Sequence, residues 1–294
     1  MAWEYGASPI NWCNDDLLDL GDEFSVEEIL GEMREAGVHG TEMGRKFPRD
    51  AQQLKEVLAA FDLQLISGWA QIHVADRRLW SEEMAQYERH LALLEALGCS
   101  VVVTAEGSGS VHWDRNGDRS QRIPWGPDEW DNVLAGLTEA GKRAAGHGLS
   151  LVYHPHLGTN IENESEIVRL LEGTQEEWVA LVLDTGHLGV AGVDVSRFVR
   201  RFGARIKHVH FKSFRQSVVQ QYWQGLGFLD AVRQGLFTVP GDGDLGFGPI
   251  VSALYETGYR GWCVIEAEQD PKVAPPLTYL RRALQYLEDL EAQV

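Results

Sequence analysis

The stretch Val179-Ala180-Leu181-Val182-Leu183-Asp184-Thr185-Gly186-His187 decides the fold of this chain. Its apolar residues run without a break, which is typical of a parallel strand that is buried on both faces. An acidic residue, a glycine and a histidine follow at once, so the strand is expected to end in polar side chains. The same sequence of an apolar strand, a polar loop and an amphipathic helix pattern recurs along the chain.

Eight such strands are expected, and most of them start about 30 residues after the previous one, as in an α/β barrel. The expected strands are Tyr5–Asn11, Val38–Glu42, Leu63–Trp69, Ser100–Ala105, Leu149–His154, Val179–Asp184, Ile206–His210 and Trp262–Glu266. Helix patterns lie between them, including one that starts after an N-cap at Ser25, with Glu28 at its third position, and ends at Gly37. Further helix patterns cover Ser81–Leu97, Pro127–His147 and Pro276–Leu290.

This alternation predicts an α/β fold, a (β/α)8 TIM barrel in which residues 1–294 form one domain. A doubly wound sheet is the alternative, but it usually carries a glycine-rich first turn, and no GxGxxG follows the first expected strand. The gaps 106–125 and 211–246 are interpreted as long loops over the active-site face, because loops of that length are usually functional.

The composition limits the class of function. The chain has 26 basic and 44 acidic residues, a net charge of −18, and no clustered basic face, so nucleic acid is not an expected partner. No apolar run approaches the roughly 18 residues that span a bilayer, and the start lacks a secretory pattern. The scattered Cys13, Cys99 and Cys263 form no disulfide framework or CxxC metal motif. A cytoplasmic protein is therefore expected.

Ionisable residues gather where the strands are expected to end, which in a barrel is the active-site face. They are Glu42, His154, His156, Asp184, His187, His208, His210, Lys212, Glu266 and Glu268. Each alone has a structural explanation, such as a hydrogen bond, a turn cap or an ion pair. Four strand ends that all carry ligand-type residues indicate a metal site, because burying so many such groups unpaired would cost several kcal/mol. A mixed imidazole and carboxylate set suits Mn²⁺, Co²⁺, Zn²⁺ or Fe²⁺.

The sequence allows two alternative roles for each of two loops and for several tryptophans. The basic loop Gly44–Asp50 is either solvated or in contact with substrate. The glycine-rich segment Pro240–Asp244 is either a plain turn or a loop whose backbone approaches the site. Of the tryptophans near expected loop ends, any one is more often a core residue than a substrate contact; they are Trp12, Trp69, Trp113 and Trp125.

The pattern Asp184-x-x-His187, His208-Val209-His210 and Glu266 resembles the xylose isomerase-like sugar isomerases and epimerases. A closer resemblance, to the myo-inosose-2 dehydratases of inositol catabolism, covers nearly the whole chain. The segments that carry it are Ser8–Asp16, Gly44–Asp50, Tyr153–Thr159, Leu183–Leu188, Phe237–Gly243 and Glu266–Pro271. Two departures stand out: a histidine occupies the fifth strand end, where the superfamily usually has a glutamate, and Gly246 stands where an acidic residue is expected.

The resemblance implies a TIM barrel that binds a divalent metal, usually Mn²⁺ or Co²⁺, and a small cyclic polyol ketone. It assigns the metal ligands to Asp184, His210 and Glu266. The fourth is His154, or less readily His156, or else water completes a site of three protein ligands. The implied reaction is that of a hydro-lyase: dehydration of 2-keto-myo-inositol to a trihydroxycyclohexane-1,2-dione. Self-association is left open.

Such a reaction needs a base for the proton next to the ketone and an acid for the departing β-hydroxyl. His156, His187 and Glu268 are the candidate bases. Lys212, expected to lose its proton beside a metal, would orient or protonate the leaving hydroxyl. The sequence does not order these four.

Three rival functions are weighed against dehydration. A metal-dependent ketose 3-epimerase or sugar isomerase shares the enolisation step, but such epimerases use the fifth-strand glutamate that is absent here. An abasic-site endonuclease of the same superfamily needs a basic surface, which the charge of −18 disfavours. A non-catalytic sugar-binding protein has no use for ligand-type residues at four strand ends.

Overall fold

The strands of the barrel form one parallel sheet that closes on itself. The computed structural model describes residues 3–114 and 117–294, and its main sheet has the order β3-β2-β1-β11-β8-β7-β6-β5-β4. The outermost members of that order are consecutive in the chain and are separated by Gly68 alone, whose carbonyl accepts a hydrogen bond from Val103 N at 3.1 Å. The strands are β1 (Glu4–Ala7), β2 (Gly40–Glu42), β3 (Gln64–Ser67), β4 (Trp69–Ile72), β5 (Val101–Glu106), β6 (Ser150–Tyr153), β7 (Ala180–Asp184), β8 (Ile206–Phe211) and β11 (Trp262–Ile265).

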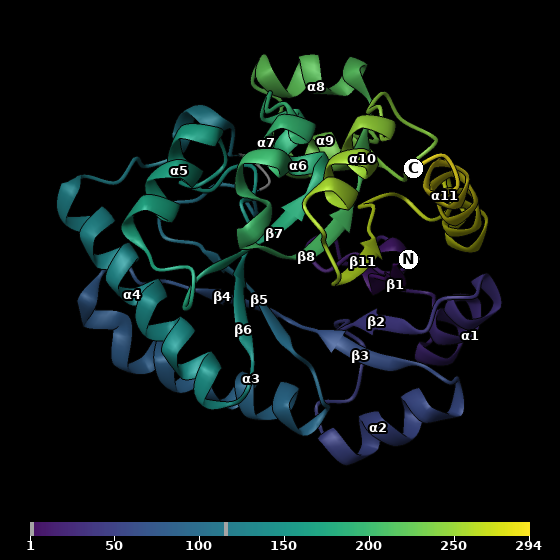
Figure 1. The fold of residues 1–294 in the computed structure, drawn as a ribbon, viewed down its shortest axis with the longest axis horizontal. Coiled ribbons are helices and arrows are strands. Elements are labelled where there is room, and N and C mark those ends of the chain that lie inside the picture. The colour runs from purple at the N-terminus through teal and green to yellow at the C-terminus, as the bar shows by residue number, and fades with distance from the viewer. Residues whose placement is uncertain (1–2, 115–116) are drawn as a thin grey trace.

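Helices surround this barrel, as Figure 1 shows, and both chain ends lie near β1, β11 and α11. The surrounding helices are α1 (Val26–Ala36), α2 (Ala51–Ala60), α3 (Trp80–Ala96), α4 (Pro127–Gly146), α5 (Glu164–Gly173), α6 (Thr185–Val190), α7 (Val195–Phe202), α10 (Gly248–Glu256) and α11 (Pro276–Glu291). The TIM barrel expected from the sequence is confirmed. No helix within the described ranges combines the length and apolarity needed to cross a bilayer.

The helix ends follow the expected capping chemistry. Ser25 Oγ accepts a hydrogen bond from Glu28 N at 3.2 Å, and Glu28 Oε2 accepts one from Ser25 N at 2.7 Å. This reciprocal pair is a capping box. Gly37 ends α1 with φ of +93°, a left-handed conformation that residues with a Cβ rarely adopt. Local sequence therefore fixes where α1 begins and ends.

Strand alternation directs the polar residues of β8 into the barrel. Val209 and Phe211 belong to the large core between the sheet and the helices. Side chains one residue along a strand point the opposite way, so His208, His210 and Lys212 face the barrel interior. Part of the barrel interior is filled by a small apolar cluster of Val101, Val103, Val152, Ala180 and Val182. The ionisable residues of β8 thus stand in the barrel, where water is scarce.

Two strand predictions are wrong in their bounds. The first strand ends at Ala7 instead of Asn11, because Pro9 starts a short 3₁₀ turn and has no N–H to donate to a neighbouring strand. The expected strand Leu63–Trp69 is broken at Gly68, after which Trp69–Ile72 continues as β4 and pairs with β5. Helix α3 causes the break, since a Cβ on Gly68 would lie 3.0 Å from side-chain atoms of His90 and of Leu94.

The interpretation of 211–246 as a long loop missed the secondary structure within it. This segment contains β9 (Ser213–Phe214), α8 (Gln216–Trp223), α9 (Phe228–Arg233) and β10 (Phe237–Thr238), and β9 pairs with β10 in an antiparallel ribbon. Its apolar side chains form a second core with residues from two loops and from α6, among them Leu17, Leu157 and Val190. We call residues 211–246 the capping insertion. Figure 1 shows α8 and α9 at the end of the barrel where β7 and β8 end.

Candidate active site

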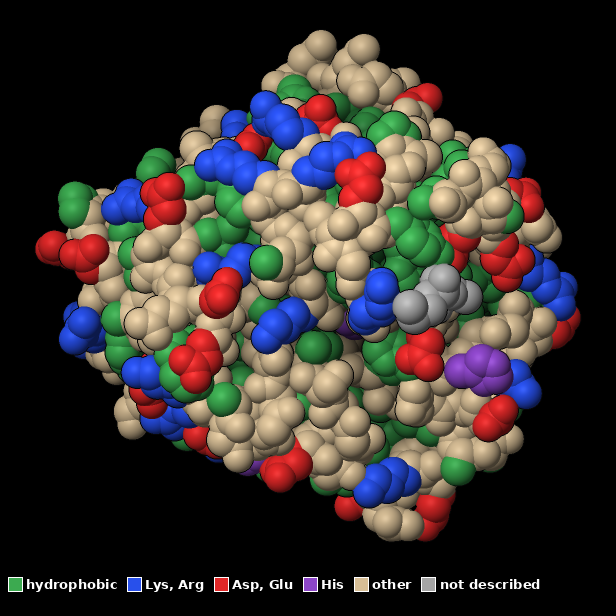
Figure 2. Space-filling model, viewed as in Figure 1, with side chains coloured by type: hydrophobic (Ala, Val, Ile, Leu, Met, Phe, Trp, Pro, Cys, Tyr) green, Lys and Arg blue, Asp and Glu red, His purple; other side chains and the backbone are tan. Residues whose placement is uncertain are grey.

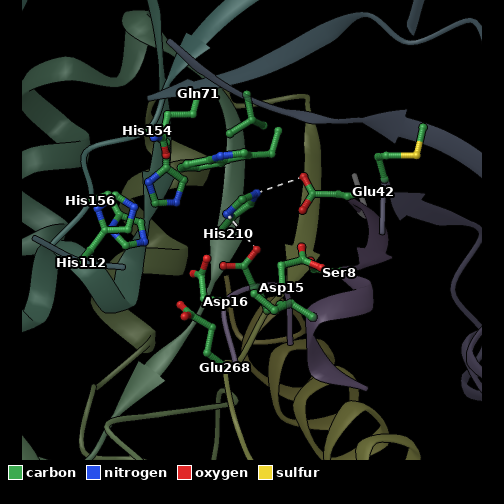
Figure 3. Close-up of a pocket in the computed structure, with 15 residues that line it drawn as sticks. Ser8, Asp15, Asp16, Glu42, Gln71, His112, His154, His156, His210 and Glu268 are labelled. Atoms are coloured by element: carbon green, nitrogen blue, oxygen red, sulfur yellow. Dashed lines mark hydrogen bonds and ion pairs between the residues drawn. The ribbon is translucent and has the colours of Figure 1, made fainter. Parts of the chain in front are cut away.

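A cavity of about 150 Å³ opens at the carboxyl ends of the strands. Residues from β1, β2, β4, β5, β6, β8 and β11, or from the loops that follow them, line it. The lining residues are Ser8, Ile10, Asp15, Asp16, Glu42, Met43, Trp69, Gln71, Val103, His112, His154, His156, His210, Glu266 and Glu268. Figure 3 shows the histidines His112, His154 and His156 on one side of the cavity and Glu42 on the opposite side. The volume holds roughly ten water molecules at about 15 Å³ each, the scale of a small ring polyol.

The structure brings together the four residues predicted as metal ligands. One donor atom from each of His154, Asp184, His210 and Glu266 lies within 4.8 Å of the other three, and all four side chains are buried. Asp184 Oδ2 is 3.4 Å from His154 Nε2 and 3.6 Å from His210 Nδ1. Glu266 Oε2 is 3.3 Å from His210 Nδ1. His156, the other candidate for the fourth position, belongs to a separate group of side chains.

This group of four has unfilled hydrogen-bonding capacity. Among the described residues, Asp184 Oδ2 and His210 Nδ1 are buried and have no hydrogen-bond partner. Burial raises the pKa of Asp184, but the charge of Lys212 counters burial and holds that pKa well below its usual value, so the carboxyl is ionised. A buried carboxylate oxygen that accepts no hydrogen bond is costly, and a cation at this point would remove the cost. The donors fit a divalent ion of the Mn²⁺, Co²⁺ or Zn²⁺ kind.

Glu42 fixes the orientation of His210. Its Oε1 accepts hydrogen bonds from Ser67 Oγ at 2.5 Å, from His208 Nε2 at 2.9 Å and from His210 Nε2 at 3.1 Å. Because a carboxylate only accepts, His210 carries its proton on Nε2, and its Nδ1 faces Asp184 and Glu266. A ligand histidine whose other nitrogen donates to a carboxylate is the usual arrangement at metal sites. The sequence placed Glu42 and His208 at strand ends without giving them this role.

Lys212 lies among three carboxylates. Its Nζ is buried 2.5 Å from Glu266 Oε1, 3.0 Å from Glu268 Oε1 and 3.4 Å from Asp184 Oδ2. Burial lowers the pKa of Lys212, but attraction to the three carboxylates, Asp184 first, holds that pKa well above its usual value. The expectation of a lysine that loses its proton beside a bound metal stays a prediction. In the chain alone, the ammonium group joins β7, β8 and the segment after β11 by ion pairs.

His156, His187 and Glu268 form a second group of neighbouring side chains. His156 Nδ1 donates to the carbonyl of Leu157 at 2.8 Å, which leaves Nε2 without a proton on the neutral ring. His187 is the opposite tautomer: its Nδ1 accepts from Leu157 N at 3.1 Å, so its proton is on Nε2, 3.7 Å from Glu268 Oε1. The backbone of one residue thus sets the proton positions of both rings.

The capping insertion supplies an apolar wall behind these two histidines. The ring of Phe228 lies 5.1 Å from that of His156, and the ring of Phe237 lies 4.8 Å from that of His187. Burial, with the neighbouring His187 next in importance, holds the pKa of His156 well below its usual value. Burial, followed by repulsion from Lys212, does the same for His187. Both rings are therefore neutral at ordinary pH.

The cavity also exposes residues for which the sequence analysis proposed no role. Asp15 and Asp16 stand at its mouth, and partial desolvation by the surrounding protein raises the pKa of each to about 6. His112 is buried in the wall, and burial lowers its pKa to about 4. The sequence gives little indication of a role for these residues. The aspartates lie in a segment that carries the family resemblance, and His112 lies in a stretch without periodicity.

The segments left open by the sequence have structural functions. In the loop Gly44–Asp50, Arg45 and Lys46 bind main-chain carbonyls of the β1–α1 loop. In Pro240–Asp244, the Asp242 carboxylate accepts hydrogen bonds from Arg215 and Thr238 of the capping insertion. Among the tryptophans, Trp69 lines the cavity, Trp12 is buried, the Trp113 ring packs against His112, and Trp125 Nε1 donates to the carbonyl of Ser108.

The chain resembles known proteins over nearly its full length. Residues 30–290 match the family described as xylose isomerase-like TIM barrel. An inosose dehydratase from Lacticaseibacillus casei is 40% identical over 290 residues, which cover 98% of this chain and 97% of that protein. An inosose dehydratase from Mesomycoplasma hyopneumoniae (strain J) is 38% identical over 287 residues, which cover 97% and 95%.

Solved structures share the fold at low sequence identity. The structure of L-ribulose 3-epimerase superposes with a TM-score of 0.73 at 16% identity and covers 99% of this chain and 95% of that one. The IolI protein with a bound zinc atom gives a TM-score of 0.73 at 14% identity, with 99% and 98% covered. These likenesses concern the barrel, whereas the sequence identity with the inosose dehydratases is specific. The chain belongs to the inosose dehydratase family of xylose isomerase-like TIM barrels.

Proposed function

We propose that this enzyme dehydrates 2-keto-myo-inositol, an inosose, to a trihydroxycyclohexane-1,2-dione. The observation that carries the proposal is the group His154, Asp184, His210 and Glu266, whose unpaired buried donors converge on a cavity the size of a small ring. A divalent cation, of which Mn²⁺ and Co²⁺ are our first choices, would bind these residues and act as a Lewis acid toward the ketone. Zn²⁺ and Fe²⁺ suit the same donors.

We assign His156 as the base. It lines the cavity, its neutral ring presents an unprotonated Nε2, and its Nδ1 is anchored on the carbonyl of Leu157. In the proposed reaction, Nε2 takes the proton from the carbon next to the ketone, and the electron pair of that C–H bond forms the enol double bond. His187 is less suited to this step, because its Nδ1 already accepts the N–H of Leu157 and its Nε2 is protonated.

We assign Glu268 and Lys212 to the departing hydroxyl. Glu268 lines the cavity, and Lys212 Nζ donates to it at 3.0 Å, so the pair forms a path from a buried ammonium group to the substrate. The carbonyl re-forms, the C=C electrons of the first step shift to the bond toward the β-carbon, and the C–O bond breaks with its electron pair on oxygen. Glu268 passes a proton from the Lys212 ammonium to the leaving oxygen, and water is released. The proton that His156 took returns through solvent and restores the ammonium group. His187 Nε2 lies behind Glu268 and orients its carboxylate. The enol that remains tautomerises to the dione.

The charge of the cavity favours a neutral substrate. Five of its lining residues are acidic, and among the residues that the structure describes no lysine or arginine lines it; the acidic ones are Asp15, Asp16, Glu42, Glu266 and Glu268. An inosose carries hydroxyls and a ketone but no charge, so it avoids repulsion from these carboxylates. A carboxylate substrate would lack a cationic partner. This separates the proposal from the reaction named for a structural neighbour, a probable 3-DHS dehydratase with a TM-score of 0.73 and 14% identity.

We also propose that residues 1–294 act as one domain in the cytoplasm. The pairing of β1 with β11 joins the two ends of the chain in one sheet, which supports a single domain. Cys13, Cys99 and Cys263 are free and buried, as suits a reducing compartment.

The test is formation of the dione. The protein is stripped with a chelator, supplied with 2-keto-myo-inositol, and followed by the ultraviolet absorbance of the enolised dione with and without Mn²⁺, Co²⁺ or Zn²⁺. Metal-dependent appearance of product is the expected result. Absence of product from metal-loaded protein would overturn the proposal, and a screen of ketohexoses would then test the epimerase alternative.

A further inference from the structure

The β1–α1 loop carries two carboxylates into the cavity from outside the group of metal-ligand candidates. Figure 3 shows Asp15 and Asp16 beside Glu268 and Ser8, across the cavity from Gln71. Neither residue belongs to a group of side chains that could hold a metal ion. The proposed proton transfers do not use them either. Their role must therefore lie in what the cavity binds.

The backbone that carries the two aspartates is tightly fixed. Asn14 Oδ1 accepts hydrogen bonds from Asp16 N at 2.9 Å and from Leu17 N at 2.7 Å. Gly21 closes the loop with φ of +77°, and a Cβ there would lie 1.7 Å from the carbonyl oxygen of Trp12. Such rigidity lowers the entropic cost of binding a ligand, since the carboxylates are already in place.

Arg45 holds this loop from outside the cavity. Its Nε donates to the carbonyl of Asn14 at 3.0 Å, and one terminal nitrogen donates to the carbonyl of Leu18 at 3.1 Å and to Asp22 Oδ1 at 3.0 Å. Lys46 Nζ adds a hydrogen bond to the carbonyl of Phe24 at 2.8 Å. The basic loop after β2 thus positions the acidic loop after β1.

The carboxylates themselves retain free acceptor capacity. The Asp16 carboxylate accepts no hydrogen bond from any described residue, and the Asp15 carboxylate accepts one from the backbone N–H of Arg45. A second polar group in the same cavity is also unsatisfied. His112, which is 4% exposed, lines the cavity, and its Nδ1 has no partner among the residues described. Rigid, unfilled acceptors beside an unpaired imidazole indicate a ligand rich in hydroxyl groups.

We propose that Asp15 and Asp16 bind adjacent hydroxyls of the ring polyol, and that Arg45 is the positioning residue for both. This inference deepens the proposed function, because it names the groups that read the hydroxyl pattern. Ionised carboxylates only accept hydrogen bonds, so each binds a hydroxyl that donates. Such charge-assisted hydrogen bonds are the stronger kind and discriminate against a ring that lacks the hydroxyl.

The experiment compares Asp15→Asn and Asp16→Asn with Asp19→Asn in the complete, metal-loaded protein. Asparagine keeps the shape of the side chain and removes its charge. Asp19 is a matched control, since it lies on the same loop but pairs with Arg233 at 2.9 Å outside the cavity. The expected result is a rise of about 10- to 100-fold in KM for each cavity variant, the range for losing a hydrogen bond to a charged group. We expect kcat and metal affinity to stay within about threefold of wild type and the control to be unchanged.

Two further measurements separate recognition from general damage. Arg45→Gln should raise KM in the same direction with kcat retained, and Arg45→Lys should restore part of the loss. An inosose that lacks the hydroxyl bound by Asp16 should have a high KM with the wild-type enzyme. Its KM should rise little further with Asp16→Asn, because the interaction that the substitution removes is already missing. An unchanged KM in both aspartate variants would overturn the inference.

Failure of the proposed reaction would be seen separately. If wild-type protein forms no dione, the same variants are titrated calorimetrically with scyllo-inositol, which has the ring hydroxyls but no ketone. Binding by wild type that weakens in Asp15→Asn and Asp16→Asn would support polyol recognition even though the reaction is different. No binding by wild type, or equal binding by all forms, would overturn it.

Discussion

Asp184 ends β7 and Glu106 ends β5, and both carboxylates are fully buried, yet their surroundings differ. Glu106 Oε1 accepts hydrogen bonds from Val74 N at 2.8 Å, Ala75 N at 3.2 Å and Ser108 Oγ at 2.5 Å, and its Oε2 accepts one from Ser108 N at 2.8 Å. Asp184 uses Oδ1 to cap α6 at His187 N, but its Oδ2 has no hydrogen-bond partner among the described residues.

This difference distinguishes a structural carboxylate from one placed to bind a ligand. Sequence position does not separate the two, since each ends an apolar strand. Glu106 satisfies the N–H groups of a turn, and the turn satisfies Glu106 in return. Asp184 is ionised beside Lys212, and its Oδ2 accepts no hydrogen bond from the described residues. Whether the carboxylate oxygens already accept hydrogen bonds, rather than the kind of residue, indicates the function.

The largest effect is expected from Asp184→Asn. Asparagine keeps an Oδ1 that can cap α6, but it replaces the unpaired Oδ2 with an amide that cannot bind a cation. We expect metal affinity to fall by more than about 100-fold, beyond the range for losing an outer partner of a ligand, and activity to be lost with it. Metal content after equilibrium dialysis measures the first effect. Retention of stoichiometric metal would show that Asp184 is not a ligand.

Glu42→Gln tests another buried carboxylate. Glu42 accepts hydrogen bonds from histidine side chains and not from backbone N–H groups. Glutamine can present its amide nitrogen toward His210 and favour the wrong tautomer of that ring. We expect metal affinity to weaken by about 10- to 100-fold while the fold is kept, because Glu42 acts through His210. Competition with a chromophoric chelator measures the affinity. An unchanged value would mean that Ser67 and His208 orient the ring without Glu42.

Glu106→Gln should give the opposite result to Asp184→Asn. Its amide nitrogen faces donors that previously shared two carboxylate oxygens, so at least one buried N–H loses its partner. The free energy of unfolding should fall by about 2–3 kcal/mol, the cost of a buried donor left unsatisfied. Urea denaturation measures this change. Metal affinity should stay within about twofold of wild type, and a large loss of metal would break the distinction drawn here.

The sequence predicted most of what local chemistry decides. The apolar runs located the barrel strands, and Ser25 and Gly37 marked the ends of α1. Residues at strand ends converge whatever the loops do, so the ionisable residues of the site could be located in advance. The family resemblance then singled out the four metal-ligand candidates.

Long-range packing decided what the sequence did not predict. The break at Gly68 depends on the approach of α3, and the capping insertion folds because its apolar side chains meet Leu17 and Leu157 from distant loops. The charge of Lys212 depends on three carboxylates from separate elements. Periodicity carries no information about such neighbours.

Asp15 and Asp16 form a third kind of carboxylate, rigid but exposed at the cavity mouth, and they give the smallest expected effect. Their pKa of about 6 lies above the ordinary value of an aspartate, so the folded chain takes up protons between about pH 4 and pH 6. Their contribution to stability is therefore complete below about pH 4 and is lost as the pH rises through 6. Hydroxyl binding needs the ionised form, so it changes in the opposite direction.

We expect KM for the inosose to rise by a few-fold between pH 7 and pH 5.5 while the free energy of unfolding contributed by the pair increases. Arg45, Glu266 and Glu268 contribute charge near the pair and remain in every variant. The double variant Asp15→Asn/Asp16→Asn should have a high KM that no longer depends on pH in this range. Steady-state kinetics and urea denaturation at matched pH values measure both quantities. If affinity and stability both fell between pH 7 and pH 5.5, general unfolding, and not protonation of these carboxylates, would explain the rise in KM.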